Sequence, residues 1–232
     1  MAMQSADKIL KDFIEKNRGR KAFLEHEVKG LLREIGFSVP NGVFIAKGIP
    51  PSTQLSALSY PLVAKVSSSR IISKSDVRGI RLGIRDEVEL KRVIEDLMEI
   101  EHAEGVLVEE MAPDGLEVIV GGVIDEQFGP IVMFGLGGVS VELFKDVAFG
   151  LAPLKEDDAL WLIKQIKGYR LLRGYRGRQP VDLDKLTDII VSVSEIMATG
   201  LIKEIDLNPI ALYPENAMLL DAKMSAAVHK VV

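Results

Sequence analysis

The order of hydrophobic and polar positions predicts helices at both ends of the chain and strands between them. Apolar residues recur at helical spacing in 6–16, 24–35, 86–100, 156–166 and 183–197. Short runs rich in branched residues, at 42–45, 61–66, 105–111, 117–124 and 130–136, are typical of strands. Consecutive strands flanked by helices favour an α+β fold over a doubly wound parallel sheet. The change from helix to strand near 104–108 is the expected internal boundary.

A hairpin is expected near the C-terminal end. Residues 213–216 carry Pro and Asn between two apolar runs, which is typical of a hairpin loop. Pairing Leu212 with Ala217 across this loop sets the register of both strands.

In that register Asn208 lies opposite Asp221, and Asp206 lies opposite Lys223. Asp206 and Asn208 point to the same side because strand side chains alternate between faces. Carboxylate oxygens completed by substrate phosphates are ligands that Mg²⁺ accepts. A solvent-facing hairpin with an ordinary Asp–Lys pair fits the same spacing, so the pattern alone leaves both interpretations open.

Composition restricts the classes of function. The chain has 232 residues, a net charge of -5 and no cysteine. The negative charge argues against nonspecific nucleic-acid binding, and the lack of cysteine excludes disulfides and thiolate metal sites. The first residues lack the apolar core of a signal peptide, and no apolar stretch is long enough to span a bilayer. A soluble, cytoplasmic protein without membrane contacts is expected.

Two further groups of residues are candidates for nucleotide binding. Lys65 is the only charged residue in an apolar strand, so it either extends to the surface or meets an anion. Glu109, Glu110 and Met111 end another strand, where a carboxylate and backbone groups can hold an adenine edge and ribose hydroxyls. A charged strand terminus without a ligand is the alternative.

Loops and histidines carry weaker signals. The glycine-rich segment 135–138 could bring N–H groups close to phosphate, but it lacks the spacing of a P-loop and equally fits a structural turn. The basic loop 174–178 could contact phosphate or a partner, or be solvated. His26, His102 and His229 are scattered and are expected to be structural or surface residues.

Several motifs follow one another in a specific order over nearly the whole chain. They include Leu24-Glu25-His26-Glu27, Lys74-Ser75-Asp76-Val77, Glu110-Met111-Ala112-Pro113, Gln127-Phe128-Gly129-Pro130, Val141-Glu142-Leu143, Lys145-Asp146-Val147, Gly174-Tyr175-Arg176-Gly177 and Asp206-Leu207-Asn208-Pro209. Together they resemble the β subunit of ADP-forming acetyl-CoA synthetase, an ATP-grasp protein related to succinyl-CoA synthetase. The resemblance implies one ATP-grasp unit over 1–232, with two lobes and nucleotide between them. Its parts are N-terminal helices (1–37), a smaller lobe (38–104) and a larger lobe with the metal-binding hairpin (105–232).

The same resemblance assigns roles to individual residues. It makes Asn208 and Asp221 the Mg²⁺ ligands and Asp206 an acidic residue that helps phosphoryl transfer. The implied nucleotide-binding residues are Lys65 at the phosphates, Glu109, Glu110 and Met111 beside adenine, and Glu117.

The implied reaction converts an acyl-CoA, ADP and phosphate into the acid, CoA and ATP. The implied partner is a CoA-binding α subunit in an α₂β₂ assembly, and phosphoryl transfer passes through phosphohistidine. The family usually has a relay histidine before Lys-Ser-Asp, where this chain has Ser73. A serine phosphate ester is stable and would trap the group, so a catalytically impaired nucleotide-binding or regulatory subunit is the alternative. The chain also departs from the family at Ser69-Arg70, Arg78 and Gly150.

Overall fold

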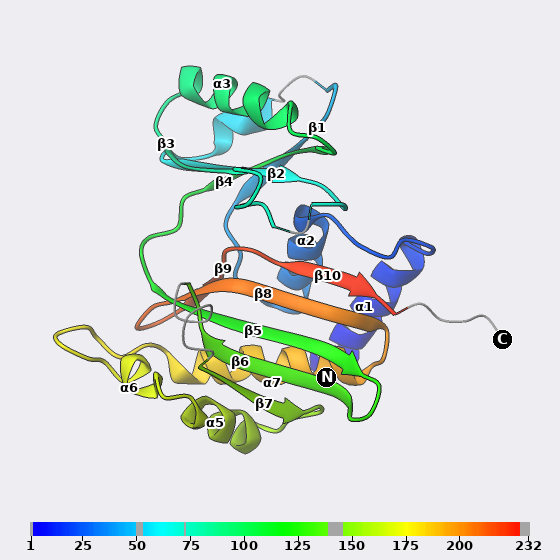
Figure 1. The fold of residues 1–232 in the computed structure, drawn as a ribbon, viewed down its shortest axis with the longest axis vertical. Helices are drawn as coiled ribbons and strands as arrows, with labels where there is room; N and C mark the ends of the chain where they lie inside the picture. The colour runs from blue at the N-terminus through cyan, green and yellow to red at the C-terminus, as the bar shows by residue number, and fades with distance from the viewer. Residues whose placement is uncertain (1, 50–52, 72, 139–145, 228–232) are drawn as a thin grey trace. The chain divides into compact units, whose positions relative to one another are not determined.

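The computed structural model describes residues 2–49, 53–71, 73–138 and 146–227 (Figure 1). The motif positions 141–145 and His229 lie outside these residues. The chain divides into two compact units. Unit 1 comprises residues 1–23, 28–39 and 114–232, and unit 2 comprises residues 24–27 and 40–113.

Unit 2 is built on a four-stranded antiparallel sheet. In spatial order its strands are β1 (Gly42–Ala46), β4 (Gly105–Glu110), β2 (Leu62–Ser67) and β3 (Ile80–Ile84). A short 3₁₀ helix, η1 (Thr53–Ala57), precedes β2. Helix α3 (Glu87–Met98) packs against β2, β3 and β4.

Helix α3 follows directly from its sequence. The side chain of Asp86 caps it by accepting a hydrogen bond from the Glu89 N–H at 2.9 Å. Its buried residues, Leu90, Val93, Ile94 and Leu97, recur at intervals of three and four and therefore form one face. That face covers one side of the sheet, so the other side is left for the polar residues described below.

Unit 1 contains a six-stranded antiparallel sheet. The strand order is β10 (Lys223–Ala226), β8 (Ile202–Leu212), β5 (Leu116–Asp125), β6 (Gly129–Leu136) and β7 (Val147–Leu151), with β9 (Ala217–Leu219) also paired to β8. Helix α7 (Leu183–Ala198) lies behind this sheet in Figure 1 and packs against β5, β6 and β8. Its long buried face, which includes Leu186, Ile190 and Val193, forms much of the core of unit 1.

The other helices in the described residues are α1 (Ala2–Lys16), α2 (Glu25–Ile35), α5 (Glu156–Gln165) and α6 (Tyr169–Leu172). Helix α5 packs against β7 and α7. Helix α2 is shared: its first turn clusters with unit 2, and its remainder contributes Val28, Leu31 and Leu32 to the core of unit 1.

The expected hairpin register is confirmed. Leu212 pairs with Ala217, and further along the same strand Asp206 pairs with Lys223. Asn208 and Asp221 fall between these two ladders, at equal distances in sequence from both. The antiparallel α+β architecture is confirmed as well.

Strands β3 and β7 were not expected from the sequence. A third strand, over 105–110, was expected but belongs to a different sheet from the one predicted. β3 and β7 are short edge strands that each contain a glycine, which weakens their sequence signal. The strand over 105–110 was expected to open the larger lobe. It is instead an inner strand of the unit 2 sheet, paired with β1 and β2, and the chain passes to unit 1 after Pro113.

Candidate functional site

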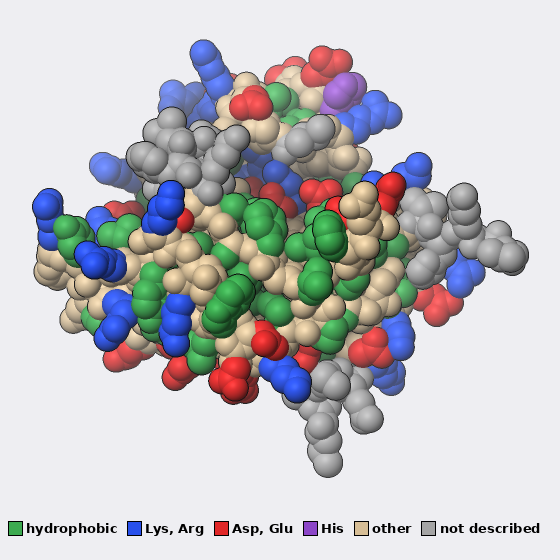
Figure 2. Space-filling view, turned by 60° about the horizontal axis from the view of Figure 1, so that its bottom comes forward, with side chains coloured by type: hydrophobic (Ala, Val, Ile, Leu, Met, Phe, Trp, Pro, Cys, Tyr) green, Lys and Arg blue, Asp and Glu red, His purple; other side chains and the backbone are tan. Residues whose placement is uncertain are grey.

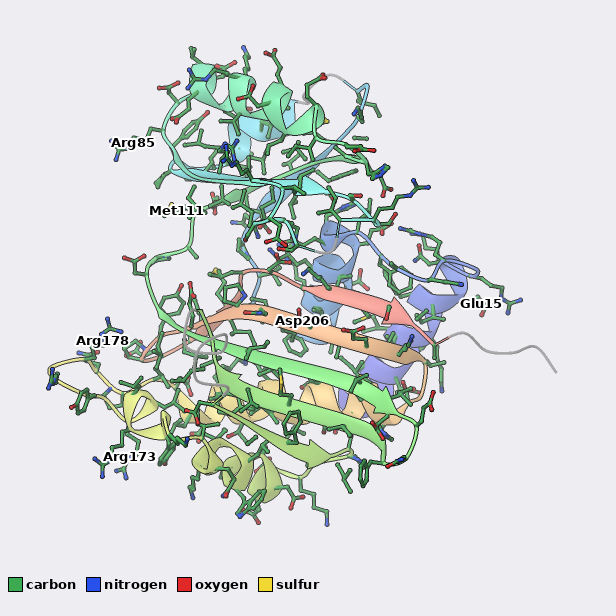
Figure 3. All side chains as sticks on the ribbon, in the orientation of Figure 1. Glu15, Arg85, Met111, Arg173, Arg178 and Asp206 are labelled. Atoms are coloured by element: carbon green, nitrogen blue, oxygen red, sulfur yellow. The ribbon has the colours of Figure 1, made fainter. Side chains whose placement is uncertain are left out.

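Strand β8 separates an apolar face from a polar one. Ile205 and Leu207 are fully buried in the core, whereas Asp206 is half-buried and Asn208 is exposed. Because neighbouring strand residues point to opposite faces, Asp206 and Asn208 share the face directed away from the core. Figure 3 labels Asp206 on this strand.

The facing segment alternates in the same way. Ala222 and Met224 are buried in the core, while Asp221 is half-buried and Lys223 is exposed. The backbone is joined across the interruption between β9 and β10 by the Leu220 N–H, which donates to the Pro209 carbonyl at 2.9 Å. The two strands therefore present their four polar side chains on one face. We call Asp206, Asn208, Asp221 and Lys223 the acidic face.

Nonpolar side chains continue this face across the sheet. Asp206 pairs with Gly121 on β5, Gly121 with Met133 on β6, and Met133 with Phe149 on β7. Phe149 is 60% exposed, and Val123 and Leu151 in the next row are also exposed. Figure 2 shows hydrophobic side chains gathered on the side of the molecule that it turns forward.

The acidic face carries few metal ligands. Among the described residues, no group of three or more His, Cys, Asp or Glu side chains is placed to hold a metal ion. Asn208 and Asp221 would supply two oxygen ligands. That number suits Mg²⁺, which binds one or two carboxylates together with substrate phosphates and water.

Lys65 does not extend to the surface. Its Nζ donates to Glu25 Oε1 and to Glu109 Oε2, both at 2.8 Å, and the Lys65 residue is only 7% exposed. The side chain lies on the face of the unit 2 sheet opposite α3, because its strand neighbours Ala64 and Val66 belong to the other face. A buried ammonium between carboxylates stays charged only because those partners compensate its lost hydration.

A second lysine joins the same group. Lys74 Nζ lies 2.9 Å from Glu25 Oε2, and Lys74, Glu25 and Glu109 are all more than nine-tenths buried. We call Glu25, Lys65, Lys74 and Glu109 the ion cluster. Its two formal positive charges balance two negative ones, and no sequence pattern indicated that Glu25 and Lys74 belong together.

Ser73 immediately precedes the ion cluster in sequence. It is half-buried, and its Oγ accepts a hydrogen bond from the Asp76 N–H at 3.4 Å. Arg78 has a φ of 52°, a backbone conformation that glycine adopts at little cost.

The end of β4 is held by hydrogen bonds within unit 2. Glu110 accepts from the Ser59 N–H and from Asn41 Nδ2, both at 2.9 Å, and these bonds hold its pKa below the usual 4.5. The Met111 N–H donates to the Pro61 carbonyl at 2.9 Å. Met111, labelled in Figure 3, is exposed and begins the connection to β5. Glu109 contacts Lys65, so the two neighbouring glutamates have different partners.

The glycine-rich turn packs against Glu117. The Gly137 N–H donates to the Glu117 carbonyl at 2.8 Å, and a Cβ on Gly137 would lie 2.9 Å from the Glu117 carbonyl carbon. Gly138 has a φ of 64°. These contacts require glycine for the turn itself. Glu117 is exposed at the start of β5.

The basic loop is exposed. Arg173 precedes the loop and Arg178 is its last residue, both labelled in Figure 3, and the Arg176 guanidinium lies 5.4 Å from the Tyr175 ring centre. Asp146, which comes just before β7 in the sequence, accepts hydrogen bonds from the Lys167 and Gly168 N–H groups, both at 2.7 Å. Asp146 thus has a structural role at the start of α6.

Of the two described histidines, His26 has a structural contact and His102 is a surface residue. The His26 ring stacks on Phe44 at a centroid distance of 3.9 Å, and His102 is exposed near the end of α3. Within the described residues no helix is both long and apolar enough to cross a membrane.

The sequence and the fold match one protein class. The family model described as "ATP-grasp domain" matches residues 15–226, and the chain belongs to this family. It is 40% identical over 224 residues to a Pyrococcus furiosus protein named acetate–CoA ligase [ADP-forming] I subunit beta. That match covers 92% of this chain and 96% of the relative.

Solved structures of one relative support the same family assignment. The chain is similar to a Ca. Korarchaeum cryptofilum acetyl-coenzyme A synthetase 1 in complex with coenzyme A and Ca-AMPCP, with a TM-score of 0.85 and 40% identity. The match covers 96% of this chain and 100% of that one. A second structure of that protein contains Mg-AMPPCP and a phosphohistidine segment pointing towards the nucleotide binding site (TM-score 0.79, 39% identity, 96% and 100% coverage).

Proposed function

We propose that this chain is the ATP-grasp subunit of an ADP-forming acyl-CoA synthetase and binds Mg²⁺ together with ADP or ATP. The observation that carries the proposal is the acidic face. Asn208 and Asp221 lie on one side of a confirmed hairpin register with Asp206 beside them. Similarity to a ligase β subunit over almost the full length of both chains supports the same assignment.

Each polar residue has a proposed role. Asn208 and Asp221 hold Mg²⁺, Asp206 assists phosphoryl transfer, and Lys65 neutralises charge on the nucleotide phosphates. Glu109, Glu110, Met111 and Glu117 complete the proposed nucleotide-binding set. Mg²⁺ supplies Lewis-acid stabilisation of the transferred phosphoryl group when it is bound.

The proposed partner is a CoA-binding α subunit, in keeping with the subunit naming of the relative. An α₂β₂ assembly and a cytoplasmic location belong to the same proposal. In this arrangement the α subunit forms the acyl phosphate and its histidine carries the phosphoryl group. This chain then exchanges that group with ADP.

One position favours a second candidate function. Ser73 stands where the relay histidine is expected, and a serine phosphate would not pass its phosphoryl group on readily. A nucleotide-binding or regulatory subunit without a relay through residue 73 is therefore the alternative.

One labelling experiment tests both functions. The chain is incubated with Mg²⁺ and ATP labelled on the γ-phosphate, with and without a CoA-binding α subunit. Label on the α subunit that requires both this chain and Mg²⁺ is the expected result. Nucleotide binding by calorimetry without label on either chain would favour the regulatory alternative. Absence of nucleotide binding, even with the partner, would overturn both.

A further inference from the structure

The ion cluster contains a connection that the proposed phosphate-binding role of Lys65 does not explain. Glu25 uses both carboxylate oxygens, Oε1 for Lys65 at 2.8 Å and Oε2 for Lys74 at 2.9 Å. The two lysines come from different parts of unit 2, one from β2 and one from the segment after it. Glu25 therefore bridges the two segments.

The segment 74–79 is a closed turn attached to β2. The Gly79 N–H donates to the Lys74 carbonyl at 2.6 Å, and the Val66 N–H donates to the Gly79 carbonyl at 2.7 Å. A Cβ on Gly79 would overlap Val66 Cγ1, so the turn lies directly against the strand. Its attachments include this backbone bond beside Lys65, the Lys74 side chain on Glu25, and the Arg78 carbonyl, which accepts from Arg81 Nη1 on β3.

We infer that Glu25 is a positioning residue that couples the turn 74–79 to Lys65. The inference rests on the proposed function in one respect, namely that a nucleotide phosphate approaches Lys65. Phosphate and the Glu25 carboxylate are both anions that bind the same ammonium, so phosphate binding weakens the Lys65–Glu25 contact. Glu25 then transmits the change to Lys74, and Ser73 is adjacent to that lysine.

Burial makes this coupling strong. Glu25 is 5% exposed and Lys74 is 8% exposed, so water screens their interaction little. Binding linkage is reciprocal. If phosphate at Lys65 changes the conformation of the turn 74–79, then the conformation of the turn also changes the affinity for phosphate. Through the ion cluster, phosphate binding at Lys65 therefore affects the position of the turn 74–79, which directly follows Ser73.

Hydrogen exchange of the turn, read by mass spectrometry in the nucleotide-free protein, tests the role of Glu25. In Glu25→Gln we expect the amides of 75–80 to exchange about tenfold faster than in the wild type, because the turn opens locally more often. Glu27→Gln is the matched control. It removes the same charge from the same helical turn, where Glu27 Oε2 accepts from the Leu24 N–H at 2.8 Å. Equal exchange in both variants would overturn the inference.

A second pair of variants covers the case in which Glu25→Gln does not fold. Lys74→Met removes the ion pair at the Lys74 end of the bridge, and Lys74→Arg keeps the charge. Faster exchange of 75–80 in Lys74→Met that Lys74→Arg reverses supports the inference. Unchanged exchange in Lys74→Met argues against it.

The same exchange experiment with bound nucleotide distinguishes a failure of this inference from a failure of the proposed function. Mg·ADP should change the exchange of 74–79 in the wild type, and the change should shrink in Lys74→Met although calorimetry still detects binding. A change of the same size in both proteins would overturn the coupling. Failure of the wild type to bind ADP would overturn the proposed function, while the nucleotide-free comparison would still decide the role of Glu25.

Discussion

Asp206 on β8 lies directly opposite Lys223 on β10, and both side chains point away from the core of unit 1. Asp206→Asn keeps the shape of the side chain but removes its charge. We expect the turnover of the reconstituted enzyme to fall about 100-fold, with a small change in Mg·ADP affinity, because the proposed role is in transfer. Steady-state kinetics and calorimetry measure the two effects. A loss confined to affinity would contradict that role.

Replacement of Asp221 by Ala should weaken the Mg²⁺-dependent part of ADP binding. Removal of one of two protein ligands should reduce the apparent Mg²⁺ affinity about tenfold or more. Calorimetric titration of ADP at several Mg²⁺ concentrations measures this dependence. Ser225→Ala, further along β10 at another outward position, is the control. Equal Mg²⁺ dependence in both variants would exclude Asp221 as a ligand.

The substitution Ser73→His tests the relay position. If the surrounding segment still supports the family chemistry, the variant should gain an acid-labile phosphoryl label when it is incubated with the α subunit, Mg²⁺ and labelled ATP. The wild type should carry no such label on this chain. Acid lability distinguishes phosphohistidine from a serine ester. An unlabelled but folded variant would indicate that the segment no longer serves as a relay.

Glu110 should contribute a pH-dependent part of the stability. The Ser59 N–H, and after it the Asn41 amide, hold the pKa of Glu110 below 4.5, so the folded state favours the ionised carboxylate. Its contribution is therefore present above the unfolded-state pKa and is lost as the pH falls through the lowered folded-state pKa. Urea unfolding of the wild type and Glu110→Gln should differ by a constant amount above pH 4.5, and the difference should shrink below it. A difference independent of pH would contradict this cause.

Gly137→Ala should destabilise unit 1. The added Cβ would lie 2.9 Å from the Glu117 carbonyl carbon and 3.0 Å from the Val118 nitrogen, so backbone atoms must move. The free energy of unfolding should fall by about 1–3 kcal/mol. Gly30→Ala in α2 is the control, since its Cβ meets nothing within 4 Å and alanine favours a helix by about 0.5–1 kcal/mol. Urea unfolding measures both, and a stable Gly137→Ala protein would show that the turn can shift.

Elements with a long and regular pattern could be predicted from the sequence. The helix over 86–100 was expected, and α3 occupies Glu87–Met98, because a capping aspartate and an uninterrupted apolar stripe act locally. β7 was missed because it is a five-residue edge strand that includes Gly150. The sequence also did not show to which sheet the strand over 105–110 belongs. The strands that pair with it, β1 and β2, lie far away in the sequence.

The acidic face was determined by the sequence. A short hairpin loop sets the register, and strand alternation then decides which side chains share a face, so Asp206, Asn208, Asp221 and Lys223 could be grouped without any distant contact. The ion cluster was decided only by the tertiary structure. Glu25 and Glu109 reach Lys65 from 40 and 44 residues away, and such contacts depend on how helix and sheet pack rather than on local spacing. A lone lysine in an apolar strand indicated either a surface position or a contact with an anion, and only the fold decided between the two and supplied Glu25 and Glu109 as the anions.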